Sequence, residues 1–124
     1  MAIHTTGLFT VETGTAVIDV RLRIFLANLE NVPHRAAVNV AKRRDNRLSQ
    51  IVAQEITLPG GATRVVEVNG IAGEDVQVTV DLPDREYPPL SPVVPGVAVV
   101  SLFPPENETT LLHWISADDF VPVG

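Results

Sequence analysis

The chain has 124 residues, of which 45% are hydrophobic, a formal net charge of -6 at pH 7 and no cysteine. This length and composition fit one globular domain with a single core and exclude an intrinsically disordered chain. No apolar run approaches the roughly 20 residues of a membrane-spanning helix, and the acidic balance argues against general nucleic-acid binding. The lack of cysteine excludes disulfides and thiolate metal sites.

Residues 1–12 are the first candidate element, "MAIHTTGLFTVE". They lack the basic start, the continuous apolar stretch and the cleavage site of a signal peptide, so we expect the segment to be retained. We predict an N-terminal arm that lends a strand to a neighbouring copy through the apolar side chains of Ile3, Leu8, Phe9 and Val11. One alternative is a strand of the chain's own domain that ends at the turn "ETGT". A disordered tail is disfavoured because such tails are usually poor in β-branched and aromatic residues.

The next elements alternate apolar and polar side chains, which is typical of strands that cover a core with one face. Residues 17–30 are predicted to be a long strand, and the turn "NVPH" leads into a returning strand over 36–43 because proline cannot donate within a ladder. The clearest strand is "VQVTVDL" at 76–82. The side chains expected to face inward are Ile18, Val20, Leu22, Ile24, Leu26, Val76, Val78, Val80 and Leu82.

The remaining segments are also predicted to be strands and turns. Residues 50–58 and 62–70 flank the turn "PGG", and the helix candidate at 48–56 is better interpreted as a strand because it is rich in β-branched residues and Pro59 follows closely. The segment 84–96, "DREYPPLSPVVPG", is predicted to be a long surface connection, since its prolines suit neither a helix nor a central strand. Residues 97–103 are apolar on both faces, and 109–123 supply one or two final strands.

These elements predict an all-β fold in which residues 13–124 form a single antiparallel two-sheet sandwich of seven or eight strands, preceded by the extended arm. Ten prolines and eight glycines punctuate the chain, and no apolar period of 3.6 residues persists for three turns. Jelly-roll and immunoglobulin-like topologies both remain open.

The residues that could carry chemistry are scattered along the chain. No paired spacing joins the histidines, no alternating Asp and Asn loop organises the acids, and no serine lies in a Gly-x-Ser-x-Gly turn. We therefore predict a protein that is not an enzyme and needs no metal or cofactor. The candidates weighed are His4, His34, His113, Glu106, Glu108, Asp118, Asp119, Ser49, Ser91, Ser101 and Ser116.

Two further features receive structural interpretations. The basic cluster "KRRDNR", with Lys42, Arg43, Arg44 and Arg47, is interpreted as a solvated hairpin end or as an ion pair between subunits. The single tryptophan, Trp114, is interpreted as a core residue, and the alternative is a residue that stacks on a ligand. Four Phe, one Tyr and one Trp are few for a glycan-binding face, which usually offers several exposed aromatic rings.

Three segments resemble small β-sandwich surface proteins of spore-forming Gram-positive bacteria and, more distantly, the subunits of endospore appendages. These segments are "VRLRIFLANLENVPHRAAVNVAKR", "ITLPGGATRVVEVNGIAGEDVQVTVDLP" and "LLHWISADDFVPV". The resemblance implies jelly-roll subunits that stack into fibres, with a short N-terminal connector that reaches into the next subunit, and a location at the cell or spore surface. Cysteines cross-link the better-known appendage subunits, and this chain has none.

Together these features predict a structural subunit whose partner is itself, in a head-to-tail homopolymer held by the N-terminal arm. Nucleic acid, a membrane span and a small-molecule ligand are not expected. The alternative is a monomeric or small-oligomeric binding module for a glycan or a protein, carried by the proline-rich segment and by "PPENE".

Overall fold

The computed structural model describes residues 2–11, 19–83, 91–103 and 108–123. Within these ranges the chain forms strands, joined by turns, and one 3-10 turn at Ala117–Asp119. The strands are β1 (Ala2–Thr10), β2 (Asp19–Asn28), β3 (His34–Arg44), β4 (Arg47–Leu58), β5 (Thr63–Val68), β6 (Asp75–Leu82), β7 (Val93–Phe103), β8 (Glu108–Ile115) and β9 (Val121–Pro122).

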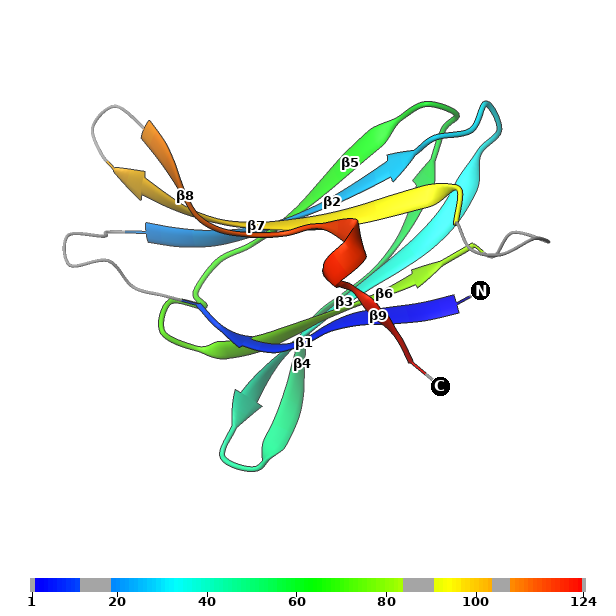
Figure 1. Cartoon of the computed structure of the whole chain (residues 1–124). Coiled ribbons are helices and arrows are strands. Elements are labelled where there is room, and N and C mark those ends of the chain that lie inside the picture. The colour runs from blue at the N-terminus through cyan, green and yellow to red at the C-terminus, as the bar shows by residue number, and fades with distance from the viewer. Residues whose placement is uncertain (1, 12–18, 84–90, 104–107, 124) are drawn as a thin grey trace.

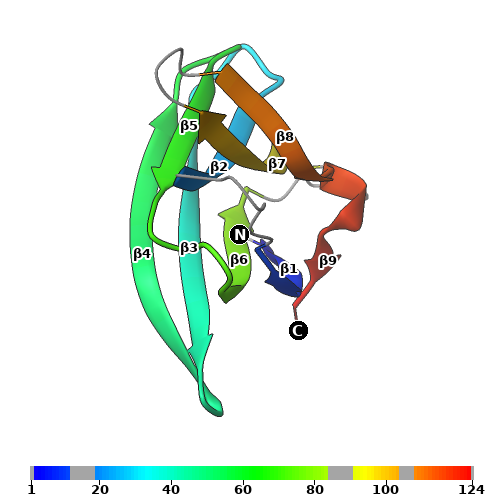
Figure 2. The same ribbon diagram turned by 90° about the vertical axis from the view of Figure 1, so that its left-hand side faces the viewer.

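The strands form two sheets that pack face to face as two layers (Figure 1). The first sheet has the order β4-β3-β6-β1-β9, which we call sheet A, and the second has the order β5-β2-β7-β8, which we call sheet B. All the neighbouring strands pair antiparallel. The predicted all-β, two-sheet antiparallel sandwich is therefore confirmed. Figure 2 shows that the β3–β4 hairpin extends beyond the neighbouring strands of sheet A.

The core lies between the sheets and is built by the alternation that the sequence displays. Along β6 each second residue is buried, and the residues between them are half-exposed. The inward side chains predicted for β2 and β6 are confirmed, apart from Ile18, which lies outside the described residues. The largest fully buried side chains are Leu22, Ile24, Leu26, Leu58, Ile71, Val11, Val38, Val40, Val76, Val78, Val80 and Val93.

Two strand pairings of this fold also occur in the immunoglobulin arrangement, and the strands beside those pairs are arranged differently. In that arrangement the second and fifth strands pair in one sheet, and the third and sixth pair in the other. Here β2 pairs with β5 and β3 pairs with β6 in the same way. However, β1 pairs with β6 instead of β2, and β7 occupies the place beside β2.

The segment predicted as an N-terminal arm is a strand of the chain's own sheet in this structure. β1 pairs with β6 from Ala2 to Thr10, and β9 lies on its other side (Figure 1). This arrangement corresponds to the internal-strand alternative. The donation of this strand to a neighbouring copy stays a prediction.

The proline-rich segment predicted as a surface connection is shorter than expected. Residues 84–90 lie outside the described residues, but β7 already begins at Val93 and pairs with β2 through Pro95 and Gly96. Pro95 is tolerated because β8 pairs with β7 only from Val97 onward, so that side of the strand carries no ladder at Pro95. The strand interpretation of residues 48–56 is confirmed by β4.

Candidate functional site

The four apolar residues predicted to mediate assembly divide between the two faces of sheet A. A bulge at Thr6 and Gly7 lets these two residues oppose the single residue Val78, and Gly7 has a φ of 69°. Such a bulge reverses the phase of alternation, because it inserts one extra residue into a period of two. Before the bulge the even-numbered residues face the core, and after it the odd-numbered residues do.

The consequence is a pair of buried side chains and a pair of exposed ones. Val11 is fully buried, and Phe9 packs against the core with its ring 5.9 Å from that of His113 in an edge-on contact. Ile3 and Leu8 are 43% and 47% exposed on the outer face. Sequence reasoning grouped these four residues because nothing in the spacing of apolar residues reveals a bulge.

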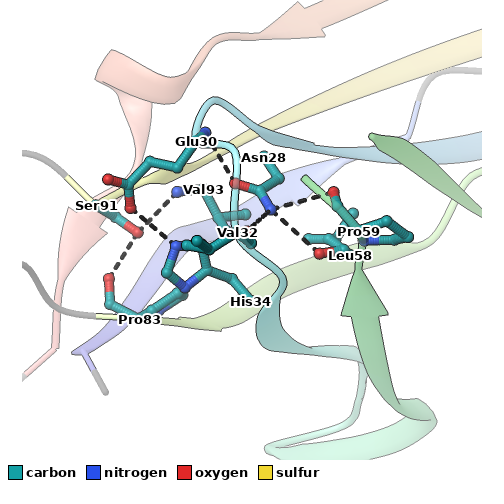
Figure 3. Close-up of polar contacts among 9 residues, drawn as sticks. All are labelled: Asn28, Glu30, Val32, His34, Leu58, Pro59, Pro83, Ser91 and Val93. Atoms are coloured by element: carbon teal, nitrogen blue, oxygen red, sulfur yellow. Dashed lines mark hydrogen bonds and ion pairs between the residues drawn. The ribbon is translucent and has the colours of Figure 1, made fainter. Parts of the chain in front are cut away.

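A second candidate region lies at one end of the sandwich, where the β2–β3 and β4–β5 turns meet around Asn28 (Figure 3). The Asn28 side chain is 3% exposed. Its Nδ2 donates to the carbonyl oxygens of Val32 (2.8 Å), Leu58 (3.1 Å) and Pro59 (3.2 Å), and its Oδ1 accepts from the N–H of Glu30 (3.0 Å). One buried amide therefore joins two turns that are distant in sequence.

His34, Glu30 and Ser91 lie near Asn28, and their contacts are structural (Figure 3). His34 Nε2 lies 2.8 Å from Glu30 Oε1. The Ser91 hydroxyl donates to the carbonyl of Pro83 (2.7 Å) and accepts from the N–H of Val93 (3.2 Å). The hydroxyl is thus engaged by backbone groups, which hold the start of β7 against the end of β6.

The other candidate histidines, acids and serines are dispersed. Within the described part of the chain, no group of three or more His, Asp or Glu side chains is placed to hold a metal ion. His4 faces a pocket of about 130 Å³ that Phe120 also lines, while the hydroxyl of Ser116 bonds Asp119 at the 3-10 turn. Asp118 and Ser49 are exposed, Ser101 is buried, and the side chains of Glu106 and Glu108 lie outside the description.

The basic cluster at the β3–β4 hairpin is partly paired within the chain. Lys42 Nζ lies 3.5 Å from a carboxylate oxygen of Glu74, and Arg43 forms an ion pair with Asp75. Arg44 and Arg47 are exposed at the end of the hairpin. The interpretation as a solvated hairpin end agrees with the exposure of these last two arginines.

The outer face of sheet B carries an aromatic pair, the exposed Trp114 and the half-buried Phe25, that sequence reasoning did not bring together. Trp114, interpreted as a core residue, is instead 48% exposed, because β8 turns this side chain away from the core. Its ring centroid lies 6.1 Å from that of Phe25, and the two planes are inclined by 54°. Phe25 lies in a strand with period-two alternation, so its signal was its place between the inward residues Ile24 and Leu26. In β8 the register shifts between Leu111 and His113, so simple alternation gave no signal for Trp114.

Charged side chains border this aromatic pair. Glu67 of β5 accepts hydrogen bonds from Arg21 Nη1 and, at 3.0 Å, from Arg23 Nε. Burial opposes ionisation of Glu67, but the hydrogen bonds and charges of the two guanidinium groups outweigh it and lower the pKa of the carboxyl below its ordinary value of 4.5. The two arginines and Glu67 therefore form a paired cluster with a formal charge of +1.

This pairing predicts a modest pH dependence of stability. A carboxyl whose pKa is lowered by folding stabilises the protein above its unfolded pKa, and that contribution is lost as the pH falls through the folded value. The Glu67 side chain is 34% exposed, so we expect Glu67→Gln to cost less than about 1 kcal/mol at neutral pH. Urea unfolding of both proteins from neutral to strongly acidic pH measures the difference. A gap that does not shrink at all between neutral and strongly acidic pH would contradict the pairing.

Comparison of the chain with protein-family models, with curated proteins and with solved structures finds no match. In the described ranges, the chain has no helix with the length and apolar character needed to cross a membrane.

Proposed function

We propose that this chain is a non-enzymatic structural subunit that assembles head-to-tail into a filament or surface layer by exchanging β1 between copies. The observation that supports the proposal is the position of β1 close to the margin of sheet A, where only the short strand β9 lies outside it. On one side it pairs with β6 through seven residues, and on the other β9 covers it through only two residue pairs, at His4 and Thr5.

The inward side chains of β1 supply the driving force for such an exchange. Phe9 and Val11 complete the core, and burial of two side chains of this kind contributes about 3–6 kcal/mol before ordering costs. A neighbouring copy whose own β1 has left offers the same position beside β6. Exchange therefore retains the same contacts between different chains, which is the low-cost route to assembly known as domain swapping.

The exchange is directional, because each copy donates one strand and accepts one. A heterologous contact of this kind continues from copy to copy unless its rotation closes a ring. The outward residues Ile3 and Leu8 then lie on the surface of the assembly, where they are available to neighbouring side chains.

The proposal is tested by placing a disulfide across the β1–β6 ladder. Leu8 and Gln77 are directly opposed and face outward, and opposed residues in antiparallel strands lie within disulfide range. Because the chain has no cysteine, the double variant Leu8→Cys/Gln77→Cys contains the only two thiols. We expect mild oxidation of concentrated protein to give a ladder of covalent multimers on a denaturing, non-reducing gel.

A matched control pair is Asn39→Cys/Thr79→Cys, which joins β3 to β6 within one chain whichever copy supplies β1. This control is expected to remain monomeric on the same gel. If Leu8→Cys/Gln77→Cys also forms only an intrachain bond at every protein concentration, the exchange of β1 is excluded.

A further inference from the structure

Apolar residues lie next to one another in two adjacent outward rows across the middle of sheet B. Phe25 of β2 is opposed by Val65 of β5 on one side and by Gly96 of β7 on the other. Trp114 of β8 is opposed by Ala98 and contacts Phe25 across Gly96. Residues of all four strands therefore contribute to one strip, which we call the aromatic strip: Phe25, Val65, Gly96, Ala98 and Trp114.

The indole ring of Trp114 rests on the backbone of β7. A Cβ atom built at Gly96 would lie 2.8 Å from Cη2, 3.3 Å from Cζ2 and 3.7 Å from Cζ3, all atoms of the six-membered ring. Only glycine leaves room for the ring to lie this close to the strand. Because one side of the ring covers Gly96 and the residue is still 48% exposed, the opposite side is presented to solvent.

Polar groups lie beside the strip in fixed positions. Arg23 is opposed by Glu67 and by Ala98, and Ala98 is opposed by Trp114, so Arg23 and Glu67 lie in the same cross-strand row as Trp114. It uses Nε to bind Glu67, and its two terminal nitrogens carry four further N–H donors. Glu67 supplies carboxylate acceptors. The outer face of sheet B therefore combines an exposed aromatic ring with the donors of Arg23 and the acceptors of Glu67, and the hydrogen bond between these two side chains fixes their positions.

The size of the strip decides between a second copy and a smaller ligand. Trp114 and Val65 are each about half exposed, and Leu111 of β8, which lies beside the strip, is 57% exposed. A whole aromatic side chain offers only about 150–250 Å², so the exposed apolar area of the strip together with Leu111 is on the order of 300–400 Å². A stable protein interface needs about 800 Å² from each partner, of which somewhat more than half, about 450 Å², is apolar. A second copy of the chain is therefore poorly matched to this strip.

The chemistry of the strip matches a sugar ring. A pyranose presents C–H groups on its faces, which pack on aromatic rings, and hydroxyl groups on its edges, which bind paired Arg and Glu side chains. The cluster of Arg21, Arg23 and Glu67 carries a formal charge of only +1 on a chain with a net charge of -6, whereas a nucleic acid requires a strongly basic face. We propose that the outer face of sheet B binds a neutral polysaccharide, with one sugar stacked on Trp114 and bordered by Phe25.

The test uses the intact chain and a defined panel of neutral polysaccharides: microcrystalline cellulose and chitin in pull-down assays, and soluble xylan and β-glucan in affinity gels. We expect retention by at least one member and at least a tenfold loss of affinity in Trp114→Ala, with partial recovery in Trp114→Tyr. Phe25→Ala and Arg23→Ala are expected to weaken binding as well, which keeps the test valid if Trp114→Ala does not fold. Leu48→Ala, at an exposed apolar position on β4, is the matched control and should bind normally.

Trp114 is the only tryptophan, so its fluorescence reports directly on the strip. Titration of the unmodified protein with a soluble oligosaccharide of the retained polymer should give a saturable change in emission. No retention by any polymer of the panel, or retention that is equal in Trp114→Ala, Phe25→Ala and Arg23→Ala, overturns the proposal. Binding of a single-stranded oligonucleotide in preference to the polysaccharides, or dimerisation that Trp114→Ala abolishes, also overturns it.

Discussion

Replacement of Asn28 by aspartate is expected to lower the free energy of unfolding by about 3–5 kcal/mol. The change keeps the shape of the side chain but replaces its NH2 group by an oxygen. Three backbone carbonyls, those of Val32, Leu58 and Pro59, then face a carboxylate instead of a donor. Because the site is 3% exposed, water offers little compensation for these lost hydrogen bonds or for the buried charge.

Denaturant unfolding, followed by circular dichroism, measures this loss. Asn28→Ala should fall between the two proteins, since it removes the donor without adding a charge. Asn69→Asp, at an exposed position in the turn between β5 and β6, is the matched control and should change the free energy of unfolding by less than about 0.5 kcal/mol. Equal stability of the Asn28→Asp and Asn69→Asp variants would show that the buried amide does not hold the two turns together.

Replacement of Val11 by aspartate is expected to cost about 4 kcal/mol or more, enough to unfold a marginally stable domain of this size. Val11 is fully buried, and its backbone is fixed on both sides: its N–H donates to the carbonyl of Glu74 and its carbonyl accepts from the N–H of Gly73, each at 2.9 Å. The side chain cannot turn outward without breaking these bonds. A carboxyl group would therefore enter the core without a partner.

The same substitution at Leu8 is the control, because Leu8 belongs to the same segment but is 47% exposed. Leu8→Asp should change the free energy of unfolding by less than about 1 kcal/mol. Thermal unfolding of both variants compares the two faces of β1 directly. Similar losses at positions 8 and 11 would contradict the reversal of phase at the Thr6–Gly7 bulge.

The two experiments also bear on different parts of the proposed assembly. Val11 belongs to the surface that an exchanged β1 would bury in its neighbour, so Val11→Asp should abolish the covalent ladder of the Leu8→Cys/Gln77→Cys variant together with folding. The hydrogen bonds of the Asn28 side chain join the β2–β3 and β4–β5 turns and involve neither β1 nor β6. A folded but weakened Asn28→Ala variant should still form that ladder.

Some features of this protein follow from local sequence alone. Alternation with a period of two assigns each side chain to one face of its strand. The segments "VRLRIFLAN" and "VQVTVDL" therefore predicted strands β2 and β6 together with their inward residues. Proline and glycine placed the turns at "NVPH" and "PGG". The number and spacing of these elements then required two packed sheets, because each sheet has one apolar face to cover.

Other features depend on partners that are distant in sequence, and only the tertiary structure decided them. The bulge at Thr6 and Gly7 exists because β1 must match the register of β6, and it separates Ile3 and Leu8 from Phe9 and Val11. Pro95 is accepted in β7 because β8 ends before it. Trp114 is exposed because its strand turns it outward over Gly96, which lies eighteen positions earlier in the chain. Local alternation indicates which residues of a strand share a face, but it does not indicate which of the two faces packs against the core.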